Sequence, residues 1–279
     1  MIPAAFDYEV AQSVEHALEL LGGDPDAKVL AGGHSLVPAM KLRISRPSKL
    51  VDIGRLSDLS YVRDGGDHIA IGALTRHADV HGDAILLAHC PIVSTTAGMV
   101  GDPQVRHRGT LGGSLAHGDP ASDLPTVMLA LGADIVIRGA SGERTVGAAD
   151  FFTGVFQTAV GEGELLTEVR VPKLDDSAGA AYVKFHRRAQ DWATVGVAAV
   201  VRKNGGGSPS AAVALTNMAG TAIRATAVEE ALAGGATPAD AAAHAAEGTE
   251  PSSDTAASAE FRKHLARVLT GRALEEALA

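Results

Sequence analysis

Ala31-Gly32-Gly33-His34-Ser35-Leu36-Val37-Pro38 is a glycine loop between a short apolar run, residues 28–31, and a segment that can begin a helix, residues 39–44. Paired glycines let the backbone approach a ligand closely and adopt positive φ. Successive N–H groups in such a turn, followed by a helix, can hold an anion. The loop has no Lys or Arg and matches neither G-x-G-x-x-G nor the phosphate loop ending in G-K-[ST]. A tight turn without a ligand is therefore the alternative to a phosphate site.

A second glycine-rich segment, residues 109–125, repeats these features. It also lacks Lys and Arg, and it pairs two glycines with two adjacent hydroxyl groups, at Thr110, Gly112, Gly113 and Ser114. Two such loops in one chain predict a single elongated ligand, held at a pyrophosphate and along a sugar chain.

The second segment also carries two carboxylates, Asp119 and Asp123. Because carboxylates repel phosphates, we expect them to accept hydrogen bonds from ligand hydroxyl groups. A metal site is the alternative, since His107 and His117 lie nearby in the sequence and such ligands bind zinc or iron. Histidines and carboxylates in a Gly/Pro-rich segment more often stabilise turns, so no metal is expected.

Composition narrows the class of protein. The 279 residues allow two or three domains, and 33 acidic against 24 basic residues give a net charge of −9, which disfavours nucleic acid and anionic membranes as partners. The single cysteine, Cys90, cannot hold an iron–sulfur cluster, which needs about four. The N-terminus lacks the features of a signal peptide, and no apolar run approaches the ~18 residues of a membrane span, so a cytoplasmic protein is expected.

Hydrophobic patterning predicts an α+β fold. A helix capped by Ser13 should end at the glycines of residues 22–23, and a long helix should form the C-terminus. We expect three segments, residues 1–55, 56–175 and 176–279. Strands are predicted at residues 28–31, 49–53, 68–73, 134–138, 144–146, 165–171, 181–186, 195–203 and 211–217, helices at residues 83–99 and 259–278, and a loose glycine turn at residues 204–207.

The two glycine loops, in this order and separation, resemble the flavin motifs of one family. It is the medium, FAD-binding subunit of molybdenum carbon monoxide dehydrogenases, within the xanthine oxidase or molybdenum hydroxylase family. The resemblance continues through residues 102–106, 118–125, 163–167 and 187–194 and covers nearly the whole chain. It implies a two-part FAD-binding domain of the vanillyl-alcohol-oxidase-like (PCMH) type, formed by the first two segments. The third segment would be an α+β domain with a three-stranded antiparallel sheet and helices.

The resemblance also implies which residues bind FAD. The two loops would hold the pyrophosphate from either side, Asp123 would meet the ribityl hydroxyls, and the C-terminal domain would close over the ring. Family members often place a tyrosine over the ring where this sequence has Trp192, its only tryptophan. The predicted cofactor residues are Ala31, Gly32, Gly33, His34, Ser35, Leu36, Gly101, Thr110, Leu111, Gly112, Gly113, Ser114, Asp123, Leu165, Leu166, Lys184 and Trp192.

Two of these residues have structural alternatives. A lone tryptophan in a strand usually packs in a core, and the motif position alone favours a cofactor contact for Trp192. Lys184, with Arg187 and Arg188, is expected from its neighbours to lie on an exposed strand face. His77, His81 and His89 are expected to be ordinary helix or loop residues.

The family's function is an electron relay. A large subunit with molybdenum cofactor oxidises the substrate, a small subunit with iron–sulfur clusters passes the electrons on, and the FAD subunit delivers them to an acceptor such as a quinone. The resemblance implies this third role, with no catalytic side chain, in a dimer of heterotrimers that meets the inner face of the membrane through its acceptor. Carbon monoxide is the first choice of substrate, with N-heterocycles and aldehydes as alternatives. A self-contained flavin oxidoreductase and a flavin-free structural subunit are the competing functions.

Overall fold

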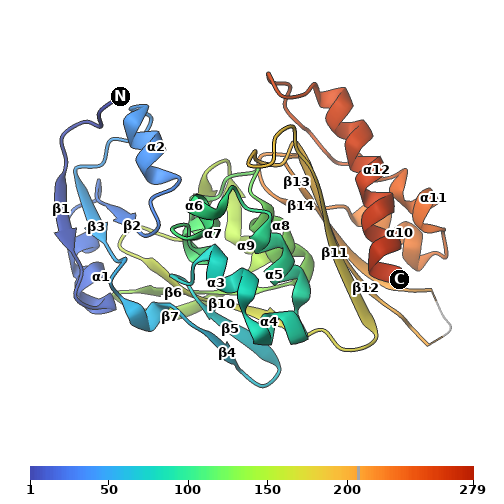
Figure 1. Cartoon of the computed structure of the whole chain (residues 1–279), viewed down its shortest axis with the longest axis horizontal. Helices are drawn as coiled ribbons and strands as arrows, with labels where there is room; N and C mark the ends of the chain where they lie inside the picture. Colours follow the sequence, from blue (N-terminus) through green and yellow to red (C-terminus); the bar gives the residue numbers. More distant parts are fainter. Residues whose placement is uncertain (206–207) are drawn as a thin grey trace.

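The computed structural model describes residues 1–205 and 208–279, and it contains three main sheets (Figure 1). The N-terminal sheet is parallel, with strand order β1-β3-β2. The side chain of Ser13 caps its first helix by accepting a hydrogen bond from the His16 N–H, as predicted. Its elements are β1 (Asp7–Val10), α1 (Val14–Gly22), β2 (Lys28–Leu30), α2 (Leu36–Lys41) and β3 (Lys49–Asp52).

The middle sheet is antiparallel, with strand order β4-β5-β10-β6-β7. Its strands are β4 (Val62–Asp64), β5 (His68–Gly72), β6 (Asp134–Gly139), β7 (Gly142–Gly147) and β10 (Leu165–Pro172), preceded by the 3₁₀ helix η1 (Ser57–Leu59). One face is covered by α3 (His77–Gly82), α4 (Ala84–His89), α5 (Pro91–Gly98), α6 (Pro103–Arg106), α7 (Leu111–His117) and α8 (Asp123–Leu131) (Figure 1). A short helix, α9 (Ala148–Phe151), leads into the hairpin β8 (Phe152–Gly154) and β9 (Gln157–Thr158).

The C-terminal sheet lies between two helical layers. Its strands are β11 (Ala178–Phe185), β12 (Val195–Arg202), β13 (Ser210–Thr216) and β14 (Ile223–Arg224), and its outer helices are α10 (Thr226–Ala233), α11 (Pro238–Ala242) and α12 (Ala259–Leu278). On β12, Val197, Ala199 and Val201 belong to the core shared with α12, whereas Ala198 and Val200 belong to the core of the middle domain. Successive side chains point to opposite faces, so β12 is buried on both.

The structure confirms the main predicted strands and the C-terminal helix, and it corrects three details. Residues 83–99 form two helices, α4 and α5, because Pro91 starts a new helix after Cys90. Residues 109–125, predicted as a loop, contain α7 and the start of α8. The C-terminal sheet has a short fourth strand, β14. The turn predicted at residues 204–207 includes residues outside the described part of the chain.

Each of the three segments predicted from the sequence contains one of these sheets, and we propose residues 1–55, 56–175 and 176–279 as the domains. Within the described residues, every helix is too short or too polar to cross a lipid bilayer.

Candidate cofactor site

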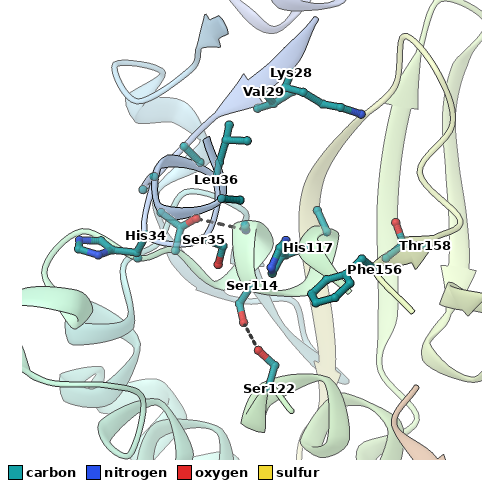
Figure 2. A pocket seen from close by; sticks show the side chains of 18 of the residues that line it. Lys28, Val29, His34, Ser35, Leu36, Ser114, His117, Ser122, Phe156 and Thr158 are labelled. Carbon is teal, nitrogen blue, oxygen red and sulfur yellow. Dashed lines mark hydrogen bonds between the residues drawn. The ribbon is translucent and has the colours of Figure 1, made fainter. Parts of the chain in front are cut away.

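A cavity of about 910 Å³ lies where the three domains meet. The first glycine loop and α2 form one side, α7 the opposite side, and the β8–β9 hairpin a third (Figure 2). Lys184 from β11 and Trp192 from the following loop complete the lining. The volume is typical of a site for an elongated organic ligand.

In the first loop the two glycines have different roles. A Cβ on Gly32 would lie 2.2 Å from the backbone oxygen of Arg108, so this glycine lets the first loop touch the chain just before the second. Gly33 has φ +77°, a conformation that side chains with a Cβ rarely adopt. Both glycines line the cavity.

The second loop is organised by the N-terminus of α7. The Thr110 hydroxyl accepts a hydrogen bond from the Gly113 N–H at 3.2 Å, which is an N-cap. A Cβ on Gly112 would lie 2.6 Å from the Cβ of Ala73, so Gly112 packs against the chain after β5. Gly113 lines the cavity. The position of its Cβ lies 2.7 Å from the capping hydroxyl of Thr110 and 3.8 Å from Ala31 of the first loop.

A buried polar cluster forms the end of the cavity near the C-terminal domain. The Lys184 Nζ lies 2.8 Å from one oxygen of Asp123, and the Tyr182 hydroxyl donates to the other oxygen at 2.7 Å. Burial raises the pKa of Asp123, although Lys184 and Tyr182 both favour its charged form. The side chains of Lys184 and Asp123 are only 3% and 6% exposed, so the expectation that Lys184 lies on an exposed strand face is wrong.

The metal alternative finds no support in this geometry. Asp123 is already bound to a cation and a hydroxyl group. Among the described residues, no group of three or more His, Cys, Asp or Glu side chains could hold a metal ion.

Trp192 lies in the loop between β11 and β12. The alternative that it packs in the core as part of a strand is therefore wrong. Its side chain lines the cavity although the residue is 67% exposed. The loop is tied down just after it, because the Asn217 amide donates to the Ala193 oxygen at 2.9 Å and the buried Arg262 donates to the Thr194 oxygen. The indole is thus available to cover one face of a ligand.

Most of the predicted cofactor residues line this cavity, but four lie behind its wall. Leu111, Gly112, Leu165 and Leu166 are buried in the surrounding structure. The cavity is also lined by residues for which no cofactor role was predicted. They include His77, which is almost fully buried. They also include Ser122, whose hydroxyl lies 3.4 Å from that of Ser114, and the ring pair His117 and Phe156, with centroids 5.0 Å apart (Figure 2).

Residues 4–174 match the family model of the FAD-binding domain in molybdopterin dehydrogenase. The chain belongs to this family. Residues 180–277 of this FAD-binding family member match a second model, the C-terminal domain of the carbon monoxide dehydrogenase flavoprotein. The chain is therefore an oxidoreductase subunit whose cofactor is FAD, and its α+β fold agrees with the prediction. The cavity fits this cofactor, because glycines allow close approach from two sides and Ser114 and Asp123 offer polar groups along its wall.

Two known proteins and one solved structure resemble the FAD-binding subunit over its full length. The carbon monoxide dehydrogenase medium chain of Hydrogenophaga pseudoflava is 41% identical, covering 100% of this chain and 99% of its own. The alpha subunit of the 6-hydroxypseudooxynicotine dehydrogenase complex of Paenarthrobacter nicotinovorans is 43% identical, covering 100% and 96%. The solved carbon monoxide dehydrogenase from Hydrogenophaga pseudoflava that lacks the Mo-pyranopterin moiety superposes with a TM-score of 0.96 at 43% identity, covering 100% and 99%.

Proposed function

We propose that this chain carries electrons from the iron–sulfur clusters of a partner subunit to an external acceptor such as a quinone. The observation that carries the proposal is an FAD-sized cavity in a chain whose single cysteine, Cys90, is buried and cannot hold a cluster of its own. When bound, the flavin supplies the electron-transfer chemistry, and the protein supplies position and electrostatics.

The chain's own residues divide this task. The two glycine loops hold the pyrophosphate from opposite sides, and Asp123 accepts hydrogen bonds from the ribityl chain while Lys184 and Tyr182 keep it in place. Trp192 covers one face of the ring and limits the access of water. The Lys184 ammonium group orients the Asp123 carboxylate, and its positive charge is largely offset by that carboxylate at 2.8 Å.

We propose a small iron–sulfur subunit and a large molybdopterin subunit as partners, assembled as a dimer of heterotrimers. The proposal is supported by relatives that are named as a medium chain and as a subunit of a complex. We place this complex in the cytoplasm, at the inner face of the membrane where a quinone acceptor is found.

Carbon monoxide is the proposed substrate of the complex, supported by the match to two carbon monoxide dehydrogenase medium chains and by the matching C-terminal domain model. Oxidation of an N-heterocycle is the second candidate, because the 6-hydroxypseudooxynicotine dehydrogenase subunit is at least as similar in sequence. The substrate binds in a different polypeptide, so these assignments concern the partner chains.

The relay role is tested on the purified chain loaded with FAD. We expect chemical reduction followed by a quinone to reoxidise the flavin, and carbon monoxide as the only reductant to leave its absorbance unchanged. Bleaching of the isolated chain by carbon monoxide or an organic substrate would favour a self-contained enzyme. A chain that binds no FAD at all would favour a structural subunit.

The substrate is tested on the complex purified with its partner chains. Flavin absorbance is followed after addition of carbon monoxide, and in parallel after 6-hydroxypseudooxynicotine. We expect carbon monoxide to reduce the flavin and 6-hydroxypseudooxynicotine to leave it oxidised. Reduction of the flavin by the organic compound and not by carbon monoxide would contradict the substrate assignment while leaving the relay role intact.

A further inference from the structure

His77 is held directly against the start of the second glycine loop. It is the first residue of α3, and its backbone N–H donates to the Gly109 oxygen at 3.0 Å. The Leu111 N–H donates back to the Thr75 oxygen, also at 3.0 Å. Its ring lies beside Gly109, where an added Cβ would be 2.9 Å from Cδ2 and 3.2 Å from Nε2 of His77. The position of the imidazole is therefore fixed relative to the loop.

The two nitrogens of the His77 ring differ in their surroundings. His77 is 3% exposed, and its Nδ1 atom is enclosed without a hydrogen-bond partner in the part of the chain that the structure describes. The side chain nevertheless contributes to the wall of the cavity. The other ring nitrogen, Nε2, is not among the enclosed unpaired atoms of the described residues. It lies beside Gly109, which lines the cavity, so Nε2 is the atom that a ligand in the cavity can reach.

The charge state of the ring follows from its surroundings. Burial is the main reason that the pKa of His77 falls to about 4, and the neighbouring Arg106 and His34 lower it further. The imidazole is neutral at pH 7, so it has one N–H donor and one lone pair. An enclosed acceptor without a partner costs less than an enclosed donor, which puts the lone pair on Nδ1 and the hydrogen on Nε2, beside Gly109.

We propose that His77 binds FAD directly, with its Nε2–H donating a hydrogen bond to an oxygen of the pyrophosphate at the junction of the two glycine loops. The inference rests on the pyrophosphate position assigned above. The two loops approach each other closely where Gly32 meets the backbone of Arg108 and Gly109. The His77 ring lies beside Gly109 and is therefore next to this contact. Neither loop contains a Lys or Arg, so a neutral donor in this place would supply affinity that the loops' side chains do not.

The test compares three variants of the full-length chain, each stripped of FAD and titrated with it by flavin fluorescence. His77→Phe keeps the ring shape without a donor, and we expect its Kd to rise about 10- to 100-fold, the usual loss for a hydrogen bond to a charged group. His77→Gln can place an amide N–H near the Nε2 position, and its Kd should stay within about threefold of wild type if that bond is restored. His77→Asn places its amide near Nδ1 and should behave like His77→Phe.

Two further measurements separate binding from a structural role. Without FAD, His77→Phe should unfold at the same temperature as the wild type or higher, because it removes an unpaired buried polar atom. At saturating FAD, the ³¹P resonances of the bound pyrophosphate should differ between His77→Phe and wild type but agree between His77→Gln and wild type.

The inference fails if His77→Phe binds FAD like the wild type, or if its FAD-free form loses stability in step with affinity. Rescue by His77→Asn in place of His77→Gln would overturn the assignment to Nε2. Failure of the wild-type chain to bind FAD would instead contradict the cofactor role of the cavity as a whole.

Discussion

Neighbouring glycines in the two loops have different roles: one allows close packing within the protein, and the next lines the cavity. Gly32 and Gly112 have no room for a Cβ because other backbone or side-chain atoms of the protein occupy the space. Gly33 is different, since its main constraint is its positive φ. The side chains of Leu30 and Val37 lie 3.3 Å from the position of its Cβ, and the residue lines the cavity. Substitution of Gly32 or Gly112 therefore affects the packing of the protein, whereas substitution of Gly33 acts on the ligand.

We predict that Gly33→Ala lowers the stability of the FAD-free chain by about 1–2 kcal/mol, the cost of a left-handed conformation. It should also weaken FAD binding, because relief of the strain moves the loop. Gly132→Ala is the matched control, since Gly132 has φ +65°, open space around its Cβ position and no place in the cavity lining. Thermal unfolding should show a loss of stability for both variants, at least as large for Gly33→Ala because its added methyl group also presses on Leu30 and Val37. FAD titration should show weaker binding only for Gly33→Ala. Equal FAD affinity in the two variants would contradict a role of Gly33 in the site.

Some of the individual residues of the candidate site could be predicted from the sequence. The glycine loops, Asp123 and Trp192 could be named from motifs, and they line one cavity. His77 could not, because its burial and unpaired Nδ1 arise from a contact between α3 and a loop more than 30 residues away. The burial of Lys184 was missed for the same reason, since α8 supplies its partner.

Among the helices and strands, α7 lies in a segment that was predicted to be a loop. Gly112 and Gly113 disfavour helix by about 1 kcal/mol each relative to alanine, so a loop was predicted. The helix forms because Thr110 caps it and because Leu111 and Leu115 are completely buried on one face. The strands were easier to predict, since runs such as that of β12 are rich in valine and have no competing helical signal.

The cap of α7 gives a prediction with a close control. Thr110→Ala should cost about 1 kcal/mol of stability and also weaken FAD binding, because the cap orients the Gly113 backbone at the cavity. Thr237 caps α11 in the same way, by accepting from the Asp240 N–H, but lies outside the cavity lining. Thr237→Ala should show a similar loss of stability by chemical denaturation with unchanged Kd for FAD. If both variants bind FAD equally well, the cap has no part in the site.

At the scale of the whole molecule, the hydrophobic cores do not follow the domain boundaries. The middle domain and one face of the C-terminal sheet share a single core, joined also by the buried hydrogen bond between Thr126 and Thr216 at 2.7 Å. The N-terminal domain packs around a separate, smaller core, to which Leu59, Leu74 and Leu165 of the middle domain also contribute. Its contacts with the rest of the chain include the side of the cavity formed by the first loop and α2.

We therefore predict that FAD stabilises the N-terminal domain more than the others, because the bound ligand joins this small domain to the rest. Hydrogen exchange with and without FAD should show the largest gain in protection in β2, α2 and the loop between them. Amides of β12 and β13, which lie in the shared core, serve as the internal control and should change little. An equal gain over the whole chain would show that the molecule opens as one unit.

The two-sided burial of β12 has a consequence for swapping parts between relatives. The family boundary near residue 175 suggests that the C-terminal domain could be exchanged as a module. However, Ala198 and Val200 of β12 interlock with the middle domain, so a chimera cut there would join two surfaces that were never matched. Grafts should instead keep residues 56–279 together. A crossover after the N-terminal sheet also has to match Leu59, Leu74 and Leu165 to the N-terminal residues of the core that they share.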